Sequence, residues 1–574
     1  MRILLVASVF NSLTQRVFAE LGDRGHTVAV CAGVDDDLLR EAASRHAPDL
    51  IVAPMLKSVI PRDIWSAYTC LVLHPGPLGD RGPSSLDWAI HEGNTRWGVT
   101  VLQADDVMDG GDVWASVDCP LPPAIGKSDF YRNEVSDAAL EAVLLAVRRF
   151  ASGTHIPRPQ HGPGWDIDDH TRPYHRQVVR RIDWSTDSTD TVLRKLRAGD
   201  SQPGVLDDFL GGEWFLHGGH AEDELRGSPG APIATRAGAL CRATTDGAVW
   251  IPELRPRRRA GGPPTFKLPA TMALGAGLPP LPEVPAPLVL PEGRRTWSDI
   301  RYREDGPVGF LEFGFPGGAM STAHCRRLLD AYRHACSRPT SVLVLGGGRD
   351  FFSNGIHLNV IEAAPDPAAE SWANIDAMDD LVEAILTTTD RLTIAAVAGN
   401  AAAGGVMLAL ATDEVWCRHG ALLNPHYRLM GLYGSEYWTY TLPRRVGATV
   451  AERLTRQALP VTTATAHRLG LVDRVVAVGP QSFAGEVARL ARLTASNPHV
   501  QNRIGTKKAI RERDEATKPL ADYRAEELAA MHRNFFAPGE SYHARRSAFV
   551  RKGPAPCTPP HLATEASGTA AIPD

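Results

Sequence analysis

The sequence predicts a multidomain α/β protein, and three observations carry this prediction. At 574 residues the chain is longer than one hydrophobic core usually supports, so roughly two to four domains are expected. Short apolar runs alternate with amphipathic stretches up to about residue 149 and again from about residue 296, an alternation typical of sheets covered by helices. Between these halves, the segment 255–293 carries dense proline runs.

The first predicted domain, residues 1–150, is an open parallel sheet with helices on its faces. The segment 12–25 places its apolar side chains on one helical face before Gly25 ends the helix. In such a sheet, ligands bind beyond the carboxyl ends of the strands. The run CLVLHPG at 70–76 is one such end, so His74 lies where this architecture places chemistry.

Composition and turn residues predict the remaining boundaries. A small β-rich domain is expected because short apolar runs are separated by frequent turn residues, and a tether is expected where proline excludes helix and central sheet. The predicted segments are a linker at 151–175, the small β-rich domain at 176–255, a Pro-rich linker at 256–293, a second α/β domain at 294–556 and a disordered tail at 557–574.

Charge, hydropathy and cysteine usage exclude several classes of protein. A net charge of -5 gives no field that favours a polyanion such as tRNA, and no apolar stretch approaches the roughly 20 residues of a membrane span. Eight cysteines without CxxC pairing argue against a disulfide framework and a zinc ribbon. We expect a cytoplasmic protein with no nucleic-acid or membrane partner. We also expect no metal, because the His- and acid-rich stretches at 161–170 and 217–223 lie in Gly-rich polar segments.

His74 and Asp109 form the first candidate site. Asp109 follows the next apolar strand of the chain, so the two side chains converge at one crevice if the strands are neighbours. A histidine oriented by a carboxylate is the arrangement of a general base or an oxyanion-stabilising group. On these residues alone, a surface histidine and a turn aspartate remain the simpler alternative.

The surrounding motif resembles the folate-dependent formyltransferases, which include methionyl-tRNA formyltransferase. The matching features are His74 and Leu78, the Arg81-Gly82 pair, the GVT strand and Asp109 in its DGGD turn. The resemblance covers roughly the first 255 residues. It implies that 10-formyltetrahydrofolate is bound, that His74 and Asp109 are catalytic, and that Arg81 and Gly82 contact the cofactor.

One departure from the formyltransferase pattern concerns Val72. The family usually has an asparagine at this position, two before the catalytic histidine, where it donates a hydrogen bond to the formyl oxygen. Valine has no such donor, and losing one oxyanion donor costs about two to three orders of magnitude in rate. Ordinary transfer of the formyl group to an amine is therefore put in doubt.

Two Gly-rich loops, FFSNGIHL and NAAAGG, form the second candidate site. Backbone N–H groups of Ile356 and Gly404, one from each loop, are placed to hold a single carbonyl oxygen as an oxyanion hole. Each loop alone is also compatible with an ordinary strand-to-helix turn.

The sequence from 296 to 556 resembles the enoyl-CoA hydratase (crotonase) family, through both loops and the final YHARRSAFVRKGPAP run. The resemblance implies a coenzyme A site with Ile356 and Gly404 as the oxyanion hole, and with Phe549 and Lys552 near the nucleotide end. The two positions of the catalytic hydratase glutamates carry Met407 and His426. Because methionine cannot move a proton, hydration of an enoyl thioester is not expected.

Tyr427 and Glu436 are the remaining acid–base candidates near the second site. Ser435 is expected to cap a helix whose first turn carries Glu436, so that the helix N-terminus stabilises the carboxylate. A purely structural role, with Glu436 as a capping acid and the tyrosines as packing residues, is the alternative.

A formyl-folate site fused to a crotonase-like site is similar to the arrangement in one family of hydrogenase maturation proteins. That resemblance implies that a formyl group is passed to coenzyme A and released as carbon monoxide for the iron of a NiFe-hydrogenase, with other maturation proteins as partners. Glu436 would act as base and Tyr427 as acid. Two alternatives stay open: a formyltransferase acting on tRNA or an amino sugar, and a non-catalytic scaffold that binds folate or coenzyme A.

Overall fold

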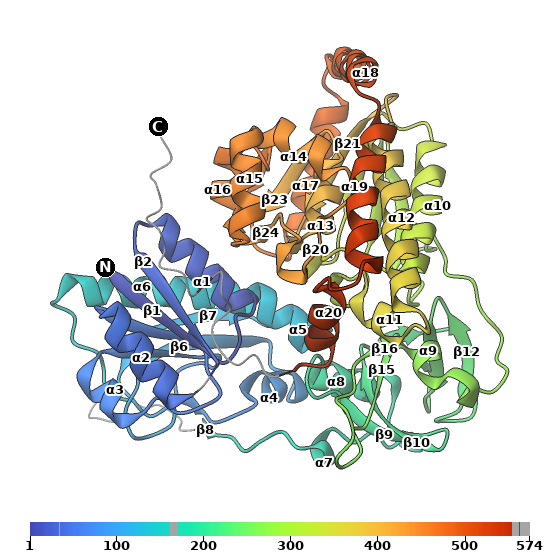
Figure 1. Ribbon diagram of the computed structural model, residues 1–574. Coiled ribbons are helices and arrows are strands. Elements are labelled where there is room, and N and C mark those ends of the chain that lie inside the picture. The colour runs from blue at the N-terminus through green and yellow to red at the C-terminus, as the bar shows by residue number, and fades with distance from the viewer. Residues whose placement is uncertain (34, 161–169, 554–561, 563–574) are drawn as a thin grey trace. The chain divides into compact units, whose positions relative to one another are not determined.

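The computed structural model describes residues 1–33, 35–160, 170–553 and 562 (Figure 1). The chain divides into two compact units. Unit 1 contains Met1–Ile182 and Arg194–Val205, and unit 2 contains Asp183–Leu193 and Leu206–Gly553. Apart from Leu562, the predicted tail lies outside the described residues.

A six-stranded sheet forms the centre of unit 1, with strand order β2-β1-β3-β4-β6-β7. The pairs from β2 to β4 are parallel, whereas β4–β6 and β6–β7 are antiparallel. The α/β class is as predicted, but the sheet is mixed rather than wholly parallel. Its strands are β1 (Arg2–Ala7), β2 (Thr27–Ala32), β3 (Leu50–Met55), β4 (Cys70–His74), β6 (Arg96–Gln103) and β7 (Val113–Pro120).

Amphipathic helices accompany this sheet. The first of them buries Leu13, Val17 and Leu21 completely, and Gly25, with φ of 80°, follows its end as predicted. The helices are α1 (Ser12–Asp23), α2 (Asp36–His46), α3 (Arg62–Ala67), α4 (Ser85–His91), α5 (Lys127–Phe130), α6 (Ser136–Ser152) and α7 (Gln177–Arg180).

The predicted β-rich segment forms two four-stranded sheets, of order β16-β15-β10-β9 and β11-β14-β13-β12. The fully buried Trp250 packs in the core of the second sheet. Helix α8 (Thr189–Gly199) precedes them. The strands are β9 (Val205–Phe209), β10 (Gly212–His217), β11 (His220–Glu222), β12 (Pro232–Arg236), β13 (Ala239–Ala243), β14 (Ala248–Ile251), β15 (Glu253–Pro256) and β16 (Leu268–Pro269).

The predicted Pro-rich tether is instead folded into unit 2. It contains strand β16 and helix α9 (Ala270–Leu274). Beyond α9, the chain exchanges backbone hydrogen bonds with β12, since Thr235 N donates to the carbonyl of Pro282 and Val284 N donates to the carbonyl of Thr235. Proline is tolerated on this edge because Pro282 supplies only its carbonyl oxygen. Proline density therefore predicted the lack of long helices correctly but not the packing.

The second α/β part of unit 2 contains a six-stranded sheet of order β17-β18-β19-β21-β23-β26 and a smaller sheet of order β20-β22-β24-β25. Four apolar runs of the sequence form strands of the larger sheet: VGFLEFG contains β18, SVLVLGGG contains β19, LTIAAVAG contains β21 and DEVWC contains all but the last residue of β23. The strands are β17 (Ile300–Asp305), β18 (Val308–Phe313), β19 (Val342–Gly346), β20 (Phe351–Ser353), β21 (Leu392–Val397), β22 (Asn400–Ala402), β23 (Glu414–Arg418), β24 (Leu422–Asn424), β25 (Val461–Thr462) and β26 (Arg474–Val476).

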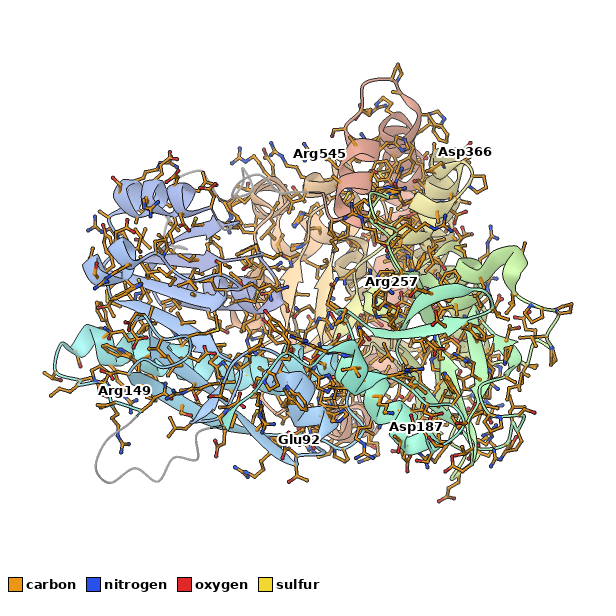
Figure 2. The ribbon with its side chains drawn as sticks, turned by 90° about the horizontal axis from the view of Figure 1, so that it is seen from below. Glu92, Arg149, Asp187, Arg257, Asp366 and Arg545 are labelled. Carbon is orange, nitrogen blue, oxygen red and sulfur yellow. The ribbon has the colours of Figure 1, made fainter. Side chains whose placement is uncertain are left out.

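Helices surround these sheets, and Figure 1 shows α12 and α19 side by side. Helix α12 begins after Asp366, which caps it through two backbone N–H groups and is labelled in Figure 2. The helices are α10 (Thr322–Cys336), α11 (Leu358–Ala363), α12 (Pro367–Leu386), α13 (Gly404–Leu410), α14 (Trp438–Val446), α15 (Ala448–Gln457), α16 (Thr463–Leu469), α17 (Phe483–Ala495), α18 (Val500–Thr517), α19 (Leu520–Phe536) and α20 (Tyr542–Val550). Among the described residues, none of the helices has the length and apolar character needed to cross a membrane.

Candidate active sites

His74 is the last residue of β4 and lies between two carboxyl groups. Its Nε2 is 2.8 Å from Oδ2 of Asp80, which is a hydrogen-bond distance, whereas Nδ1 is 3.5 Å from Oδ2 of Asp109, which is an ion-pair contact. Only 4% of the histidine is exposed. Asp80 therefore accepts the Nε2 proton and orients the ring, and Asp109 lies beside the other nitrogen.

Asp109 reaches His74 by a different route from the one predicted. The strands β4 and β6 are neighbours, but they are antiparallel, so the end of β6 at Gln103 pairs with Leu71 rather than with His74. The loop that follows β6 carries Asp109 back. Gln160 holds this loop by donating to the carbonyls of Asp109 and Gly111, at 2.7 and 2.9 Å.

The backbone around Asp109 is arranged for its carboxylate. Asp109 itself has φ of 54°, a left-handed conformation that aspartate tolerates better than most residues. Its Oδ2 accepts the N–H of Gly82 at 3.0 Å. Gly82, which was predicted to contact the cofactor, thus contacts the Asp109 carboxylate directly, and the backbone oxygen of Arg81 accepts the N–H of Arg172.

Arg172 completes this site from a segment that the sequence predicted to be a linker. Strand β8 (His170–Thr171) pairs with β5 (Asp80–Arg81), and Arg172 Nε then donates to Oδ1 of Asp80 at 3.0 Å. Arg172 also binds Glu92, which is labelled in Figure 2. The segment from 151 to 175 therefore contributes to the site, although residues 161–169 lie outside the described part.

In unit 2, the two predicted amides lie close together. Gly355 has φ of 78°, and a Cβ added there would lie 3.3 Å from the N atom of Gly404. Ile356 follows Gly355 directly, and Gly404 is the first residue of α13, whose N–H groups have no acceptor within the helix. The backbone thus brings the loop that carries Ile356 against the N atom of Gly404, an approach that is compatible with the predicted oxyanion hole.

Glu436 lies directly against Gly404. A Cβ added at Gly404 would lie 2.1 Å from Oε1 of Glu436, so only glycine leaves room for the carboxyl group. The other oxygen, Oε2, accepts the hydroxyl of Tyr427 at 2.6 Å. The two predicted acid–base residues are therefore hydrogen-bonded to each other beside the two amides.

The predicted helix cap at Ser435 is wrong. Helix α14 begins at Trp438, and Glu436 precedes it with φ of 61°. Ser435 Oγ donates to Asp379 at 2.6 to 2.8 Å instead of accepting helix N–H groups. No local pattern indicates this contact, because Asp379 lies on α12, far away along the chain.

The Glu436 carboxyl group is 1% exposed, and its environment disfavours charge. Burial raises the pKa of Glu436 to about 8, and the neighbouring Asp379 carboxyl group adds to this shift. Burial also raises the pKa of Tyr427 well above its usual value. A carboxyl group with a pKa near the working pH is suited to act as a general base.

Neither of the residues at the positions of the hydratase glutamates carries a carboxyl group. Met407 is fully buried in the hydrophobic core of unit 2, and His426 is half-buried after β24. A different acid, Glu436, lies against Gly404 instead, and it belongs to a turn rather than to α13.

The predicted nucleotide-end residues lie at the end of the last described helix. Phe549 is on α20 with 55% of its surface exposed, and Lys552 follows with its Nζ 5.1 Å from the centre of the Phe549 ring. Glu362 of α11 holds α20 by accepting from Arg546, Ser547 and Arg551, each at 2.9 Å. An exposed ring beside a cation at a fixed helix end is compatible with an adenine nucleotide. Among the described residues, no group of three or more His, Cys, Asp or Glu side chains is arranged to hold a metal ion.

Three family models match this chain in the order that the sequence predicts. Formyl transferase matches residues 23–147, the formyl transferase C-terminal domain matches 176–262, and enoyl-CoA hydratase/isomerase matches 318–556. Methionyl-tRNA formyltransferase of Syntrophus aciditrophicus is 26% identical over 34% of this chain and 63% of its own length. These matches cover the parts separately.

Relatives that span the whole chain decide the family. Hydrogenase maturation factor HoxX of Bradyrhizobium diazoefficiens is 48% identical, over 97% of this chain and 96% of its own length. The chain belongs to the HypX/HoxX family of hydrogenase maturation factors. The crystal structure of HypX from Aquifex aeolicus in complex with tetrahydrofolic acid is 43% identical, covers 99% of both chains and has a TM-score of 0.94.

Within this HypX/HoxX protein, the structure brings together both predicted groups of residues. Asp109 contacts both His74 and Gly82 in unit 1, and in unit 2 Gly404 lies against Glu436, which is hydrogen-bonded to Tyr427. Sequence reasoning missed the side chains that hold these residues, which are Asp80, Gln160 and Arg172 in unit 1, and Asp379 and Glu527 beside the turn of Glu436 in unit 2. Asp80 directly precedes the Arg81-Gly82 pair and was the one partner that the motif could have indicated.

Proposed function

We propose that this hydrogenase maturation factor takes the formyl group of 10-formyltetrahydrofolate, transfers it to coenzyme A and releases it as carbon monoxide. The observation that carries the proposal is the buried Glu436–Tyr427 pair against Gly404, because a hydrogen-bonded base and acid beside two amides suit removal of a proton from a small thioester. The HypX relative crystallised with tetrahydrofolic acid supports the folate half.

The first step belongs to unit 1. The 10-formyl group is a substrate here. Only glycine at position 76 leaves room for the His74–Asp80 pair, because a Cβ at Gly76 would lie 2.4 Å from Nε2 of His74 and 2.3 Å from Oδ2 of Asp80. His74, oriented by Asp80, is placed to assist attack on the formyl carbon, and Asp109 stabilises the ring as it takes up a proton. The thiol of coenzyme A is the proposed acceptor: it gives up its proton to His74 as the C–S bond forms, the bond between the formyl carbon and N10 of the folate then breaks, and the proton passes to N10 of the departing tetrahydrofolate.

The second step belongs to unit 2, where the Ile356 and Gly404 amides would hold the oxygen of the formyl thioester. Glu436 removes the formyl proton while the C–S bond breaks, which leaves carbon monoxide and a thiolate. Tyr427 protonates the thiolate and then recovers a proton from Glu436 through their 2.6 Å hydrogen bond. The reaction is balanced, because one formyl thioester gives one carbon monoxide and one thiol without an oxidant or reductant.

The surroundings of Tyr427 support both protonation states of this pair. When Glu436 is ionised, the tyrosine hydroxyl donates to it. When Glu436 holds the proton, the carboxyl group donates to the tyrosine oxygen, and Tyr427 turns its own proton to the carbonyl of Ser435, which is 3.0 Å away. Neither state leaves a buried donor without an acceptor.

The residues also suit coenzyme A at this site. Its thioester oxygen would meet the two amides, and its nucleotide end would meet the exposed Phe549 and Lys552 at the end of α20. If the protein transferred the formyl group to an amine, or only bound folate or coenzyme A, the Glu436–Tyr427 pair would have no catalytic role. Cytoplasmic location and partnership with other hydrogenase maturation proteins remain part of this proposal.

Deuterium at the formyl carbon tests the proposal. The wild-type protein, given the labelled 10-formyltetrahydrofolate and coenzyme A, should release carbon monoxide and pass the deuterium to solvent. Glu436→Gln should bind and use the folate but release no carbon monoxide, because the amide cannot accept the formyl proton. Glu512→Gln, at a 67% exposed side chain on α18, is the matched control and should behave as wild type. Deuterium retained in a formamide would instead establish an amine-directed formyltransferase.

A further inference from the structure

The turn that carries Glu436 has an unusual backbone. Gly434, Glu436 and Tyr437 have φ of 98°, 61° and 58°, and the last two are residues that rarely adopt a left-handed conformation. Such a turn persists only where its surroundings hold it. The side chains that hold this one are two buried acids from two neighbouring helices.

Asp379 of α12 holds the first half of the turn. Its Oδ1 accepts the N–H of Glu436 at 2.8 Å, and its two oxygens accept the hydroxyl of Ser435. Glu527 of α19 holds the second half by accepting the N–H groups of Tyr437 and Thr439, at 2.9 and 2.8 Å. Both acids are fully buried.

The groups that face Glu436 come from several elements. Tyr427 donates a hydrogen bond to it. Burial and the nearby charge of Glu436 both raise the pKa of the Cys325 thiol on α10. The acids of α12 and α19, Asp379 and Glu527, complete its surroundings. Arg524 of α19 provides the nearby positive charge. However, its close partners are Asp376, Asp380 and Glu383, at 2.7 to 3.0 Å, while its Nε is 4.0 Å from Asp379.

We propose that Asp379 is the positioning residue of Glu436: it fixes the left-handed turn that carries Glu436 and places a second buried carboxyl group beside it. This inference rests on the proposed function of Glu436 as the base. Asp379 accepts hydrogen bonds from two adjacent residues of this turn, Ser435 and Glu436. These bonds fix the geometry of the turn in a way that packing alone would not.

The second effect of Asp379 is electrostatic. A negative charge nearby disfavours ionisation of Glu436, and the Asp379 carboxyl group is the largest contribution after burial to the raised pKa of Glu436. Burial likewise raises the pKa of Asp379 to about 7. Glu436 is thereby kept a stronger base than an ordinary glutamate, which is what removal of a formyl proton needs.

Asp379→Asn removes the negative charge of residue 379 but keeps its hydrogen bond to the turn, because the amide oxygen still accepts the N–H of Glu436. The titration of Glu436 is followed directly by infrared spectroscopy, with its carboxylic acid band assigned from the difference between wild type and Glu436→Gln. We expect the midpoint to fall by about one pH unit or more, and the pH profile of carbon monoxide release to move with it. Asp330→Asn, at a 79% exposed side chain on α10, is the matched control and should leave the midpoint unchanged. An unshifted midpoint in Asp379→Asn would overturn the inference.

Ser435→Ala tests the hold while every charged group stays in place. Removing one of the hydrogen bonds of Asp379 should slow carbon monoxide release at every pH, and an unchanged rate would contradict the positioning role. The infrared titration needs no turnover, so the two claims fail separately. Carbon monoxide release that persists in Glu436→Gln would remove the proposed base, whereas the Asp379 shift would still be measured.

Discussion

A methyl group added at Gly404 should stop carbon monoxide release while the first turnover of formyl-folate continues. The new Cβ of Gly404→Ala would lie 2.1 Å from Oε1 and 2.6 Å from Cδ of Glu436. Glu436 would have to move by about 1 Å to relieve this contact, and a misplacement of that size can cost about 100-fold in rate. Its bonds to Tyr427 and to the turn oppose the movement.

The assay measures carbon monoxide by its binding to reduced haem, and folate turnover by absorbance. Gly485→Ala is the matched control, because Gly485 also lies in a helix of unit 2 and a Cβ there would meet nothing within 4 Å. The control should release carbon monoxide at the wild-type rate. Wild-type release by Gly404→Ala would refute the placement of Glu436 as the base beside this amide.

Four further results are expected. Asp80→Asn should slow formyl-folate consumption by at least about tenfold, because the amide no longer fixes the Nε2 proton of His74; an unchanged rate would remove Asp80 from the site. Carbon monoxide release should rise with pH and level off above about 8, since Glu436 must be ionised and its pKa is raised to that value, and a rate that falls over this range would contradict the assignment. The melting temperature should change with pH in the opposite direction. Buried acids such as Glu436 keep their protons in the folded state up to about pH 8, whereas the unfolded chain releases them above about pH 5. The melting temperature should therefore fall between about pH 5 and pH 8. Phe549→Ala should weaken coenzyme A binding about tenfold, as for loss of a base-stacking ring, and calorimetry that shows unchanged affinity would place the nucleotide elsewhere.

Much of the fold was predictable because its signals are local. The apolar runs became β1, β18, β19, β21 and β23, and Gly25 ended α1. The antiparallel order of β6 and the packing of the Pro-rich segment depend on partners far along the chain, so local patterns could not predict them. In the Pro-rich segment, for example, the carbonyl of Pro282 accepts the N–H of Thr235 on β12.

The candidate sites divide in the same way. His74, Asp109, Ile356 and Gly404 lie in motifs with a fixed order of residues, and the structure places each set together. The environment of Glu436 could not be predicted from its neighbours in sequence, because the acid that shapes it, Asp379, lies on another helix. Ser435 is a residue that favours helix N-caps, and only the tertiary contact with Asp379 shows that it has a different partner.

The measurement that tests the central claim most directly is carbon monoxide release from 10-formyltetrahydrofolate with and without coenzyme A. With the formyl carbon labelled with ¹³C, we expect labelled carbon monoxide, equal in amount to the folate consumed, only when coenzyme A is present. Release that is equally fast without coenzyme A would contradict the thioester route. Folate consumption with labelled formamide or formate and no carbon monoxide would contradict the account as a whole.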